Sequence, residues 1–152
     1  MTIGFKRAQG FNLVQLMIGL AVVGILLAIG YPTYDAQMTE NRRADAKIAL
    51  VELAQLQENY FAKNNGRYAS TFDQLGFSAS SHYLGYTLLD NSTLISKDGH
   101  YVLTFTAAGT NTFLLTARAD PNGVQTSDEQ CQNFSINHQG LRTSQPNSSD
   151  CW

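Results

Sequence analysis

Charged side chains are scarce in this sequence, and one long stretch has none at all. Asp, Glu, Lys and Arg make up 14% of the 152 residues, against about 25% in an ordinary soluble domain. None of them occurs from Ala8 to Tyr34. A run of about 20 apolar residues is what a helix needs to cross a lipid bilayer. The sequence therefore predicts a membrane-spanning segment near the N-terminus, followed by a chain long enough for about one domain.

The charges at the two ends of this segment predict its orientation. Lys6 and Arg7 precede it and Asp35 follows it. The positive-inside rule then places the N-terminus in the cytoplasm and everything beyond Tyr34 outside. A secretory signal peptide would have a shorter apolar run and a small-x-small cleavage site after it. Neither feature is present, so a cleaved signal peptide is disfavoured, while an uncleaved signal anchor stays open at this point.

Cysteine is equally scarce, with Cys131 and Cys151 as the only pair. Their spacing lacks the C-x-x-C pattern of a redox centre or a zinc site. Both cysteines follow the apolar segment, on the side of the membrane where disulfides form and persist. The pair therefore predicts a structural disulfide that closes a loop of about 20 residues and contributes roughly 3 kcal/mol in the chain-entropy estimate.

Catalytic and metal-ligating patterns are missing as well. His82, His100 and His138 lie far apart and lack metal-ligand spacing. Asp120–Gly123, followed by Asp128 and Glu129, is the one acidic loop, and calcium binding is the minor alternative there. Asp-Pro-Asn-Gly is first of all a good turn sequence. The sequence predicts no enzyme, no metal and no cofactor.

The residues after Pro32 change from uniformly apolar to amphipathic. Apolar residues recur at steps of three and four, as on a helix with one buried face: Ala46, Ala49, Leu50, Leu53, Leu56 and Tyr60. The opposite face is predicted to be solvated and carries Arg42, Arg43, Asp45, Lys47, Glu52 and Glu58. A helix from Phe11 to Lys63 would be roughly 80 Å long. It should bend at Pro32 and end near Asn64-Asn65-Gly66.

The rest of the chain predicts a small antiparallel sheet. After a connecting region at 67–82, alternation and turn residues predict three strands and a shorter fourth: Tyr83–Leu89, Tyr101–Thr106, Phe113–Ala119 and Asn133–His138. Residues 108–111 supply a hairpin turn between the second and third. The tail from Leu141 to Trp152 is predicted to be a polar segment held by Cys151. The fold class is α+β, with the sheet packed on the amphipathic half of the helix.

The segment KRAQGFNLVQLMIGLAVVGILLAIGYPTY, from Lys6 to Tyr34, resembles the N-terminus of class A type IV prepilins. The resemblance implies a leader at 1–10 that a prepilin peptidase removes between Gly10 and Phe11. Phe11 is then the methylated first residue of the mature chain. The same resemblance divides the remainder into a transmembrane or filament-core helix at 11–34, an amphipathic helix at 35–66 and a secreted head at 67–152.

One position departs from the family pattern. Family members usually carry a glutamate five residues after the cleavage glycine, where this chain has Gln15. That glutamate is implied to pair with the N-terminal amine of a neighbouring subunit and so to set the register of the filament. Gln15 accepts a hydrogen bond without neutralising the amine. Three explanations for Gln15 remain open. The subunit occupies a tip or priming position in the filament, it is a pilin with weaker self-assembly, or the glutamine is an introduced substitution.

Two further segments and the C-terminus resemble a pilin subgroup that includes minor pilins and a competence DNA receptor: RRADAKIALVELAQLQENYFAKNNGRYA, QCQNFSINHQG and DCW. The resemblance implies that Cys131 and Cys151 bound a surface region of the head. It also implies a subunit stored in the inner membrane and then moved to a surface pilus. The implied partners are other pilins, the prepilin peptidase and the inner-membrane assembly platform.

Two other functions remain as alternatives. A DNA-binding competence pilin should carry a basic stripe on its head. From Asn64 onward, however, the sequence has four Lys and Arg residues and seven Asp and Glu residues, a net charge of −3. DNA is therefore a possible but not a favoured partner. A type II secretion pseudopilin is the second alternative, and it is disfavoured by the Cys131–Cys151 pair and the terminal DCW.

Overall fold

The computed structural model describes residues 12–78, 83–146 and 150–152, without the side chains of 30–33, 83 and 106–109. Its internal contacts divide the chain into two units, Met1–Gln37 and Met38–Trp152, and each is described by itself. We call the second unit the head. The bend predicted at Pro32 and the cleavage residues Gly10 and Phe11 lie outside the described side chains.

Helix α1 spans Leu13–Lys63, and it therefore enters both units. The predicted end of the helix is confirmed, because Asn65 and Gly66 adopt left-handed φ values of 55° and 73°. The backbone N–H of Gly66 donates to the carbonyl oxygen of Phe61 at 3.1 Å, which closes the last turn. A residue with a left-handed backbone after the last turn is a common helix stop, and Gly adopts it without strain.

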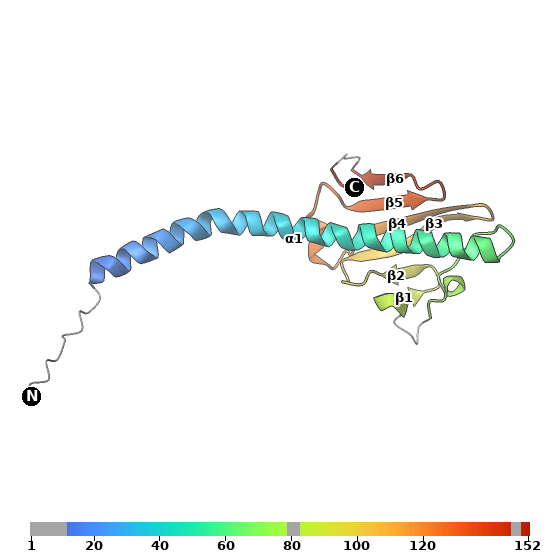
Figure 1. Ribbon diagram of the computed structural model, residues 1–152, viewed down its shortest axis with the longest axis horizontal. Helices are drawn as coiled ribbons and strands as arrows, with labels where there is room; N and C mark the ends of the chain where they lie inside the picture. Colours follow the sequence, from blue (N-terminus) through green and yellow to red (C-terminus); the bar gives the residue numbers. More distant parts are fainter. Residues whose placement is uncertain (1–11, 79–82, 147–149) are drawn as a thin grey trace, which may run out of the picture. The chain divides into compact units, whose positions relative to one another are not determined.

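Six antiparallel strands form a single sheet in which each strand pairs with the next along the chain. They are β1 (Thr87–Asp90), β2 (Thr93–Ile95), β3 (Tyr101–Gly109), β4 (Thr112–Ala119), β5 (Asn133–Asn137) and β6 (Arg142–Gln145). The head part of α1 lies across one face of this sheet (Figure 1). The predicted α+β class is thus confirmed, with two more strands than the sequence indicated.

Three details of the strand prediction were wrong, each for a local reason. The strand predicted at Tyr83–Leu89 begins only at Thr87, because Leu84 and Gly85 have φ values of 56° and 87° and belong to a 3-10 turn. Strand β2 is only three residues long, too short for alternation to be recognised. Strand β6 lies within the predicted polar tail and has one buried side chain, Ser144, so it carries no apolar signal.

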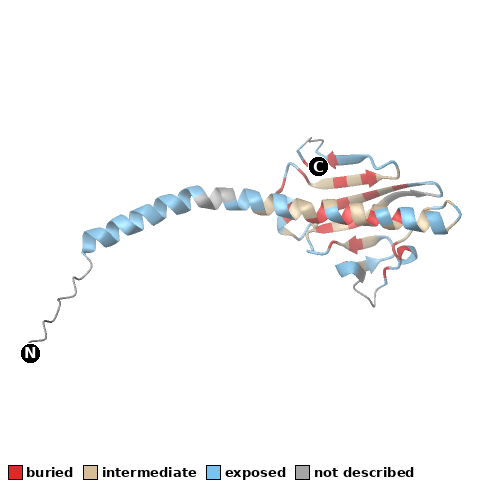
Figure 2. Cartoon of the chain, viewed as in Figure 1, coloured by how far each residue is buried: buried red, intermediate tan, exposed pale blue. Residues whose placement is uncertain are grey.

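The core of the head lies between α1 and the sheet (Figure 2). Ala46, Ala49, Leu50 and Leu53 are at most 1% exposed, which confirms the predicted apolar stripe. The inward side chains of the sheet meet them, among them Tyr101, Leu103, Leu115 and Phe134, all 0% exposed. Inward and outward side chains alternate along β4 and β5, as the period of a strand requires.

A buried glutamine fixes the chain where it leaves the helix. Gln57 is 0% exposed, its side-chain Nε2 donates to the carbonyl oxygen of Ala69, and its Oε1 accepts from the backbone N–H of Ala69, both at 2.9 Å. These paired bonds hold the 67–78 segment against α1 and satisfy both backbone groups of a buried residue. Phe72 and Phe77 of that segment then enter the core.

The solvated helix face predicted from the sequence is partly wrong. Asp45 is only 7% exposed, and the side chain of Arg43 is 11% exposed. Both residues lie on one turn of α1. The loop between β4 and β5 covers Arg43. The turn before β3 covers Asp45, whose Oδ1 lies 3.5 Å from the backbone nitrogen of Asp98. Burial of these charges requires partners, and the partner of Arg43 defines the region described next.

Candidate assembly segment and disulfide region

Residues 13–29 of α1, which we call the apolar segment, expose large apolar side chains in every direction. From Leu13 to Ile29 these side chains are 51–71% exposed. An 18-residue window of the helix has a mean hydropathy of 2.5, and none of it is buried within the structure. A helix that is apolar all around needs an apolar environment, such as a membrane or the interior of an assembly.

The start of this segment has a hydrogen-bond pattern that sequence reasoning missed. Asn12 Oδ1 accepts from the backbone N–H of Val14 at 3.2 Å, and Gln15 Oε1 accepts from the backbone N–H of Asn12 at 3.4 Å. Asn12 thus acts as an N-cap for the second helical residue, and Gln15 at the third reaches back to the N-cap N–H as in a capping box. The sequence signal was Asn12 followed three residues later by Gln15, the position that departs from the family pattern. The register role predicted for Gln15 involves a second subunit and stays a prediction.

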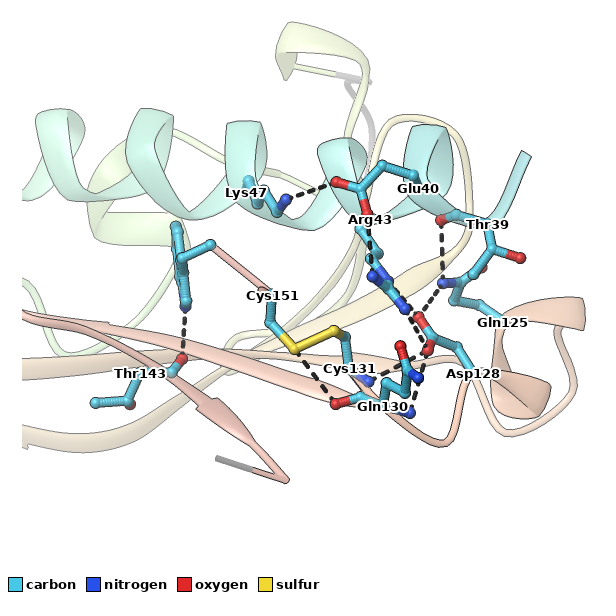
Figure 3. Close-up of a disulfide and its surroundings, with 11 residues drawn as sticks. Thr39, Glu40, Arg43, Lys47, Gln125, Asp128, Gln130, Cys131, Thr143 and Cys151 are labelled. Atoms are coloured by element: carbon cyan, nitrogen blue, oxygen red, sulfur yellow. Dashed lines mark hydrogen bonds and ion pairs between the residues drawn. A yellow bond between two sulfur atoms is a disulfide. The ribbon is translucent and has the colours of Figure 1, made fainter. Parts of the chain in front are cut away.

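The disulfide between Cys131 and Cys151 is present in the head and confirms the predicted pairing (Figure 3). Its Cα atoms are 5.6 Å apart across a separation of 20 residues. Cys131 and Cys151 are 1% and 0% exposed. The bridge fastens the C-terminus to the loop that precedes β5. The ring of Trp152 packs edge-on against the ring of Phe134, with 5.7 Å between the ring centroids. The Trp152 Nε1 donates to the carbonyl oxygen of Thr143 at 2.7 Å.

Next to the disulfide, a buried ion pair joins this loop to the helix. Arg43 makes two bonds to the carboxylate of Asp128, from Nε at 2.7 Å and from Nη2 at 2.8 Å. Asp128 Oδ1 also accepts from the backbone N–H groups of Gln130 and Cys131, each at 3.2 Å. Gln125 Nε2 donates to Asp128 Oδ2 at 2.9 Å (Figure 3). Sequence reasoning did not find this pair, because nothing in the spacing of 85 residues connects its members.

The surroundings of Asp128 decide its ionisation. Burial opposes the charged form, but the hydrogen bonds and charge of Arg43, together with the backbone N–H groups of Cys131 and Gln130, outweigh it and hold the pKa of Asp128 below its usual value. The same carboxylate helps to keep the pKa of Arg43 raised. Asp128 is therefore a charged structural partner of α1, and it does not join Asp120 in an acidic group of the kind the calcium alternative needed.

The Asp120–Gly123 sequence forms the turn that its residue types predict. Asp120 Oδ1 accepts from the backbone N–H of Asn122 at 3.0 Å, and the Asp120 carbonyl oxygen accepts from the backbone N–H of Gly123 at 2.9 Å. Across the described ranges of the chain, no three His, Cys, Asp or Glu side chains gather as a metal-binding group would. Of the three histidines, His82 lies outside the described residues.

A family model described as type IV minor pilin ComP, DNA uptake sequence receptor, matches residues 32–135. The chain belongs to this family. The match covers most of the head, including Arg43, Asp128 and Cys131, and it begins after the apolar segment. Our prediction of a type IV pilin of the minor or competence subgroup is confirmed, and the chain is a pilin subunit of a type IV pilus.

Two known proteins show how far the similarity extends. The type IV major pilin protein PilA of Myxococcus xanthus is 33% identical over 72 residues, which are 47% of this chain and 32% of that protein. The chain thus matches about a third of the length of this relative. A type IV pilin from Shewanella oneidensis matches in structure with a TM-score of 0.45 and 25% identity, over 75% of this chain and 97% of that one.

Proposed function

We propose that the chain is made as a prepilin, is stored in the inner membrane with its N-terminus in the cytoplasm, and is then built into a type IV pilus as a minor subunit. One observation carries this proposal: the apolar segment exposes all of its large side chains, while the head has a complete core of its own. Transfer of such a helix from the bilayer to an apolar filament interior keeps these side chains away from water in both states.

Processing is the first step of this proposal. A prepilin peptidase would cut between Gly10 and Phe11, and Phe11 would be methylated as the first residue of the mature chain. Mass spectrometry of the protein from assembled pili should find Phe11 at the N-terminus. A Gly10→Leu variant, recovered from the membrane fraction, is the control and should retain Met1. An intact Met1 in the unchanged protein, or an N-terminus beyond Tyr34, would contradict the proposal.

Gln15 would take the position of the register contact with the amine of a neighbouring subunit. The capping box makes a clean test available, because glutamate fits the same position of a capping box as glutamine does. Gln15→Glu should therefore leave the start of the helix intact and change only the charge that faces the neighbouring amine. Filament incorporation, measured by quantitative immunoblot of sheared pili, should rise. Unchanged incorporation would mean that position 15 does not define this subunit's place in the filament.

DNA binding by the head is a second candidate function, favoured by the family description of a DNA uptake sequence receptor. The head as a whole is acidic, so a DNA surface would have to be local. Lys63 and Arg67 offer one, because both line an open hollow of about 600 Å³ at the end of α1. Its other lining residues are uncharged and polar or aromatic: Tyr60, Asn64, Asn65, Tyr68, Ser70 and Gln74. Such side chains suit phosphate and base contacts.

The DNA proposal is tested with duplex fragments and the full chain in detergent. Lys63→Ala with Arg67→Ala should weaken binding and flatten its salt dependence, since each lost phosphate contact lowers the slope by about one. Lys47→Ala is the matched control, because Lys47 already pairs with Glu40 at 3.0 Å. Binding that is absent at low salt, or that is equal in the double variant and the control, would remove this candidate.

A further inference from the structure

The two sulfurs of the disulfide are placed by two separate sets of noncovalent contacts. Cys131 belongs to the loop between β4 and β5, and Cys151 belongs to the segment that follows β6. One set of contacts ties the loop to α1, and the other docks the segment after β6 on the sheet (Figure 3). Because neither set uses the S–S bond, both can form in a chain whose two cysteines are still thiols.

The loop between β4 and β5, residues 120–132, is closed by its own backbone hydrogen bonds. At its neck, the backbone N–H of Ala119 donates to the carbonyl oxygen of Gln132 at 2.9 Å. Within the loop, Val124–Ser127 form a 3-10 turn. The strands on both sides belong to the sheet that packs on α1. Packing of the core therefore brings a loop of defined shape to the helix, without help from the disulfide.

The Arg43–Asp128 pair then fixes the position of Cys131. Arg43 bonds to both oxygens of the Asp128 carboxylate, at 2.7 and 2.8 Å. The same carboxylate accepts from the backbone N–H of Cys131 at 3.2 Å, so one side chain connects the helix to the cysteine. The backbone N–H of Gln130 donates to it as well. The carbonyl oxygen of Gln130 lies 3.3 Å from Cys151 Sγ, where a thiol group would donate a weak hydrogen bond.

Trp152 places the other cysteine from the side of the sheet. Its Nε1 donates to the carbonyl oxygen of Thr143 on β6, and its ring meets the ring of Phe134 on β5. The guanidinium group of Arg142 lies over the indole ring, 5.3 Å from its centroid. None of these three contacts involves a sulfur atom. They can therefore hold the adjacent Cys151 at the sheet in the thiol state as well.

We propose that Arg43 and Asp128 are positioning residues for disulfide formation. The head folds first, the ion pair docks the loop on α1, and the bridge then closes between two cysteines that already lie side by side. The opposite order would require a flexible chain to close a loop of 20 residues before the core places either cysteine, which costs conformational entropy. This role requires neither filament assembly nor DNA binding.

A disulfide of a small thiol or of a dithiol protein serves as the oxidant. One cysteine, after loss of its proton, attacks a sulfur of that disulfide, forms a mixed disulfide and releases one thiolate. The second cysteine also loses its proton, attacks the cysteine sulfur of the mixed disulfide and releases the other thiolate. Two cysteine thiols are thereby oxidised to one disulfide, and the oxidant is reduced to two thiols. Arg43 and Asp128 favour the second attack, because only that step depends on the distance between Cys131 and Cys151.

The test uses the full chain in detergent micelles. The chain is reduced in urea and returned to native buffer that contains reduced and oxidised glutathione. Mass spectrometry after acid quenching counts the free, mixed and bridged forms, and their ratio gives the effective concentration of one cysteine at the other. In native buffer, this concentration should exceed the value for the same chain in urea by about 100-fold, since a flexible linker alone gives only about millimolar values.

Two variants weaken the ion pair to different degrees. Asp128→Asn should lower the effective concentration about tenfold, within the usual range of coupling between two sites, and the mixed disulfide with glutathione should accumulate. Arg43→Lys retains the charge but lacks the planar fork that binds both carboxylate oxygens. It should therefore give a value between those of the unchanged chain and Asp128→Asn. Arg43→Lys also carries the test if circular dichroism shows that the reduced Asp128→Asn chain does not fold.

Two controls separate positioning from general stability. Glu129→Gln changes the neighbouring exposed carboxylate and should leave the effective concentration unchanged. Leu94→Ala removes a buried side chain of β2, which β3 separates from β4 and the loop. It should lower the stability of the head and leave the effective concentration unchanged.

Three results would overturn the proposal. The unchanged chain would have the same effective concentration in native buffer and in urea, which would mean that the fold does not place the cysteines. Asp128→Asn and Arg43→Lys would both match the unchanged chain, which would remove the role of the ion pair. Leu94→Ala would lower the effective concentration as much as Asp128→Asn does, which would assign the effect to overall stability.

Discussion

The apolar segment and the head use the same helix in opposite ways. Between residues 13 and 29, α1 exposes large apolar side chains in every direction. Between residues 46 and 53, Ala46, Ala49, Leu50 and Leu53 form a stripe that is at most 1% exposed. Leu20 and Leu50 have the same side chain but are 65% and 0% exposed. The environment of a leucine here is decided by whether its own unit supplies a sheet to cover it.

This contrast predicts that damage to one region should leave the other intact. The head is stabilised by its buried core, by ion pairs such as Arg43–Asp128 and Lys97–Glu52, and by one disulfide, all contained within Met38–Trp152. The apolar segment is stabilised by the transfer of its side chains from water to an apolar environment. Each substitution below is expected to change either the stability of the head or the membrane insertion of the apolar segment. A substitution that changed both would contradict this separation.

The largest effect is expected at Asp128. Asp128→Asn leaves the largely buried Arg43 with only the exposed Glu40, at 3.0 Å, as its counter-charge, and breaking a buried ion pair costs about 3–5 kcal/mol of unfolding free energy. Urea denaturation of the head, followed by Trp152 fluorescence, measures this loss. Glu129→Gln is the control, because the neighbouring carboxylate is exposed and should change stability by less than about 0.5 kcal/mol. Equal midpoints for the two variants would show that the Arg43 pair is not a determinant of stability.

The second effect belongs to the apolar segment. Leu20→Lys should cost about 3–4 kcal/mol of membrane insertion, because a charge replaces a favourable leucine near the centre of the segment. Membrane retention after carbonate extraction should fall, with the urea midpoint of the head unchanged. Leu141→Lys is the matched control, since Leu141 is 60% exposed in the head, close to the 65% of Leu20. Similar losses of retention for both would contradict the division of roles.

The disulfide should contribute somewhat less. Cys131→Ser with Cys151→Ser removes a cross-link that closes a loop of 20 residues, and the expected loss is about 3 kcal/mol of unfolding free energy. Calorimetry of the head should show a lower melting temperature, with membrane retention of the full chain unchanged. Reduction of the unchanged head by dithiothreitol should reproduce the shift. A head that melts at the same temperature in all three states would refute this prediction.

The smallest effect is the dependence of head stability on pH. Because the pKa of Asp128 is lowered in the folded head, its contribution is fully present above the unfolded value of about 4 and is lost as pH falls through the folded pKa. Glu52, whose pKa is also lowered despite partial burial by its bonds to Lys97 and Tyr86, adds a loss of the same sign. Urea midpoints measured from pH 6 downward should fall less steeply for Asp128→Asn. Parallel curves would assign the acid sensitivity to other carboxylates.

Periodicity and turn chemistry were sufficient where a signal is local. The helix end at Asn65 and Gly66, the inward stripe of α1, strands β3 to β5 and the Asp120 turn all follow from residues that are near each other in the sequence. Prediction failed where the deciding partner is remote or the signal is short. Strand β6 exists because it pairs with β5, and Arg43 is buried because the loop carrying Asp128 covers it.

The sequence by itself determined the apolar segment, the family and the identity of the two bridged cysteines. Each of these features can be recognised without knowledge of the fold. The signals are the length of the apolar run, the glycine–aromatic junction and the single pair of cysteines. Only the tertiary structure decided that Asp128 neutralises Arg43 and that the polar C-terminal tail contributes strand β6 to the sheet. Register and loop placement arise from packing of distant segments, and no local pattern specifies them.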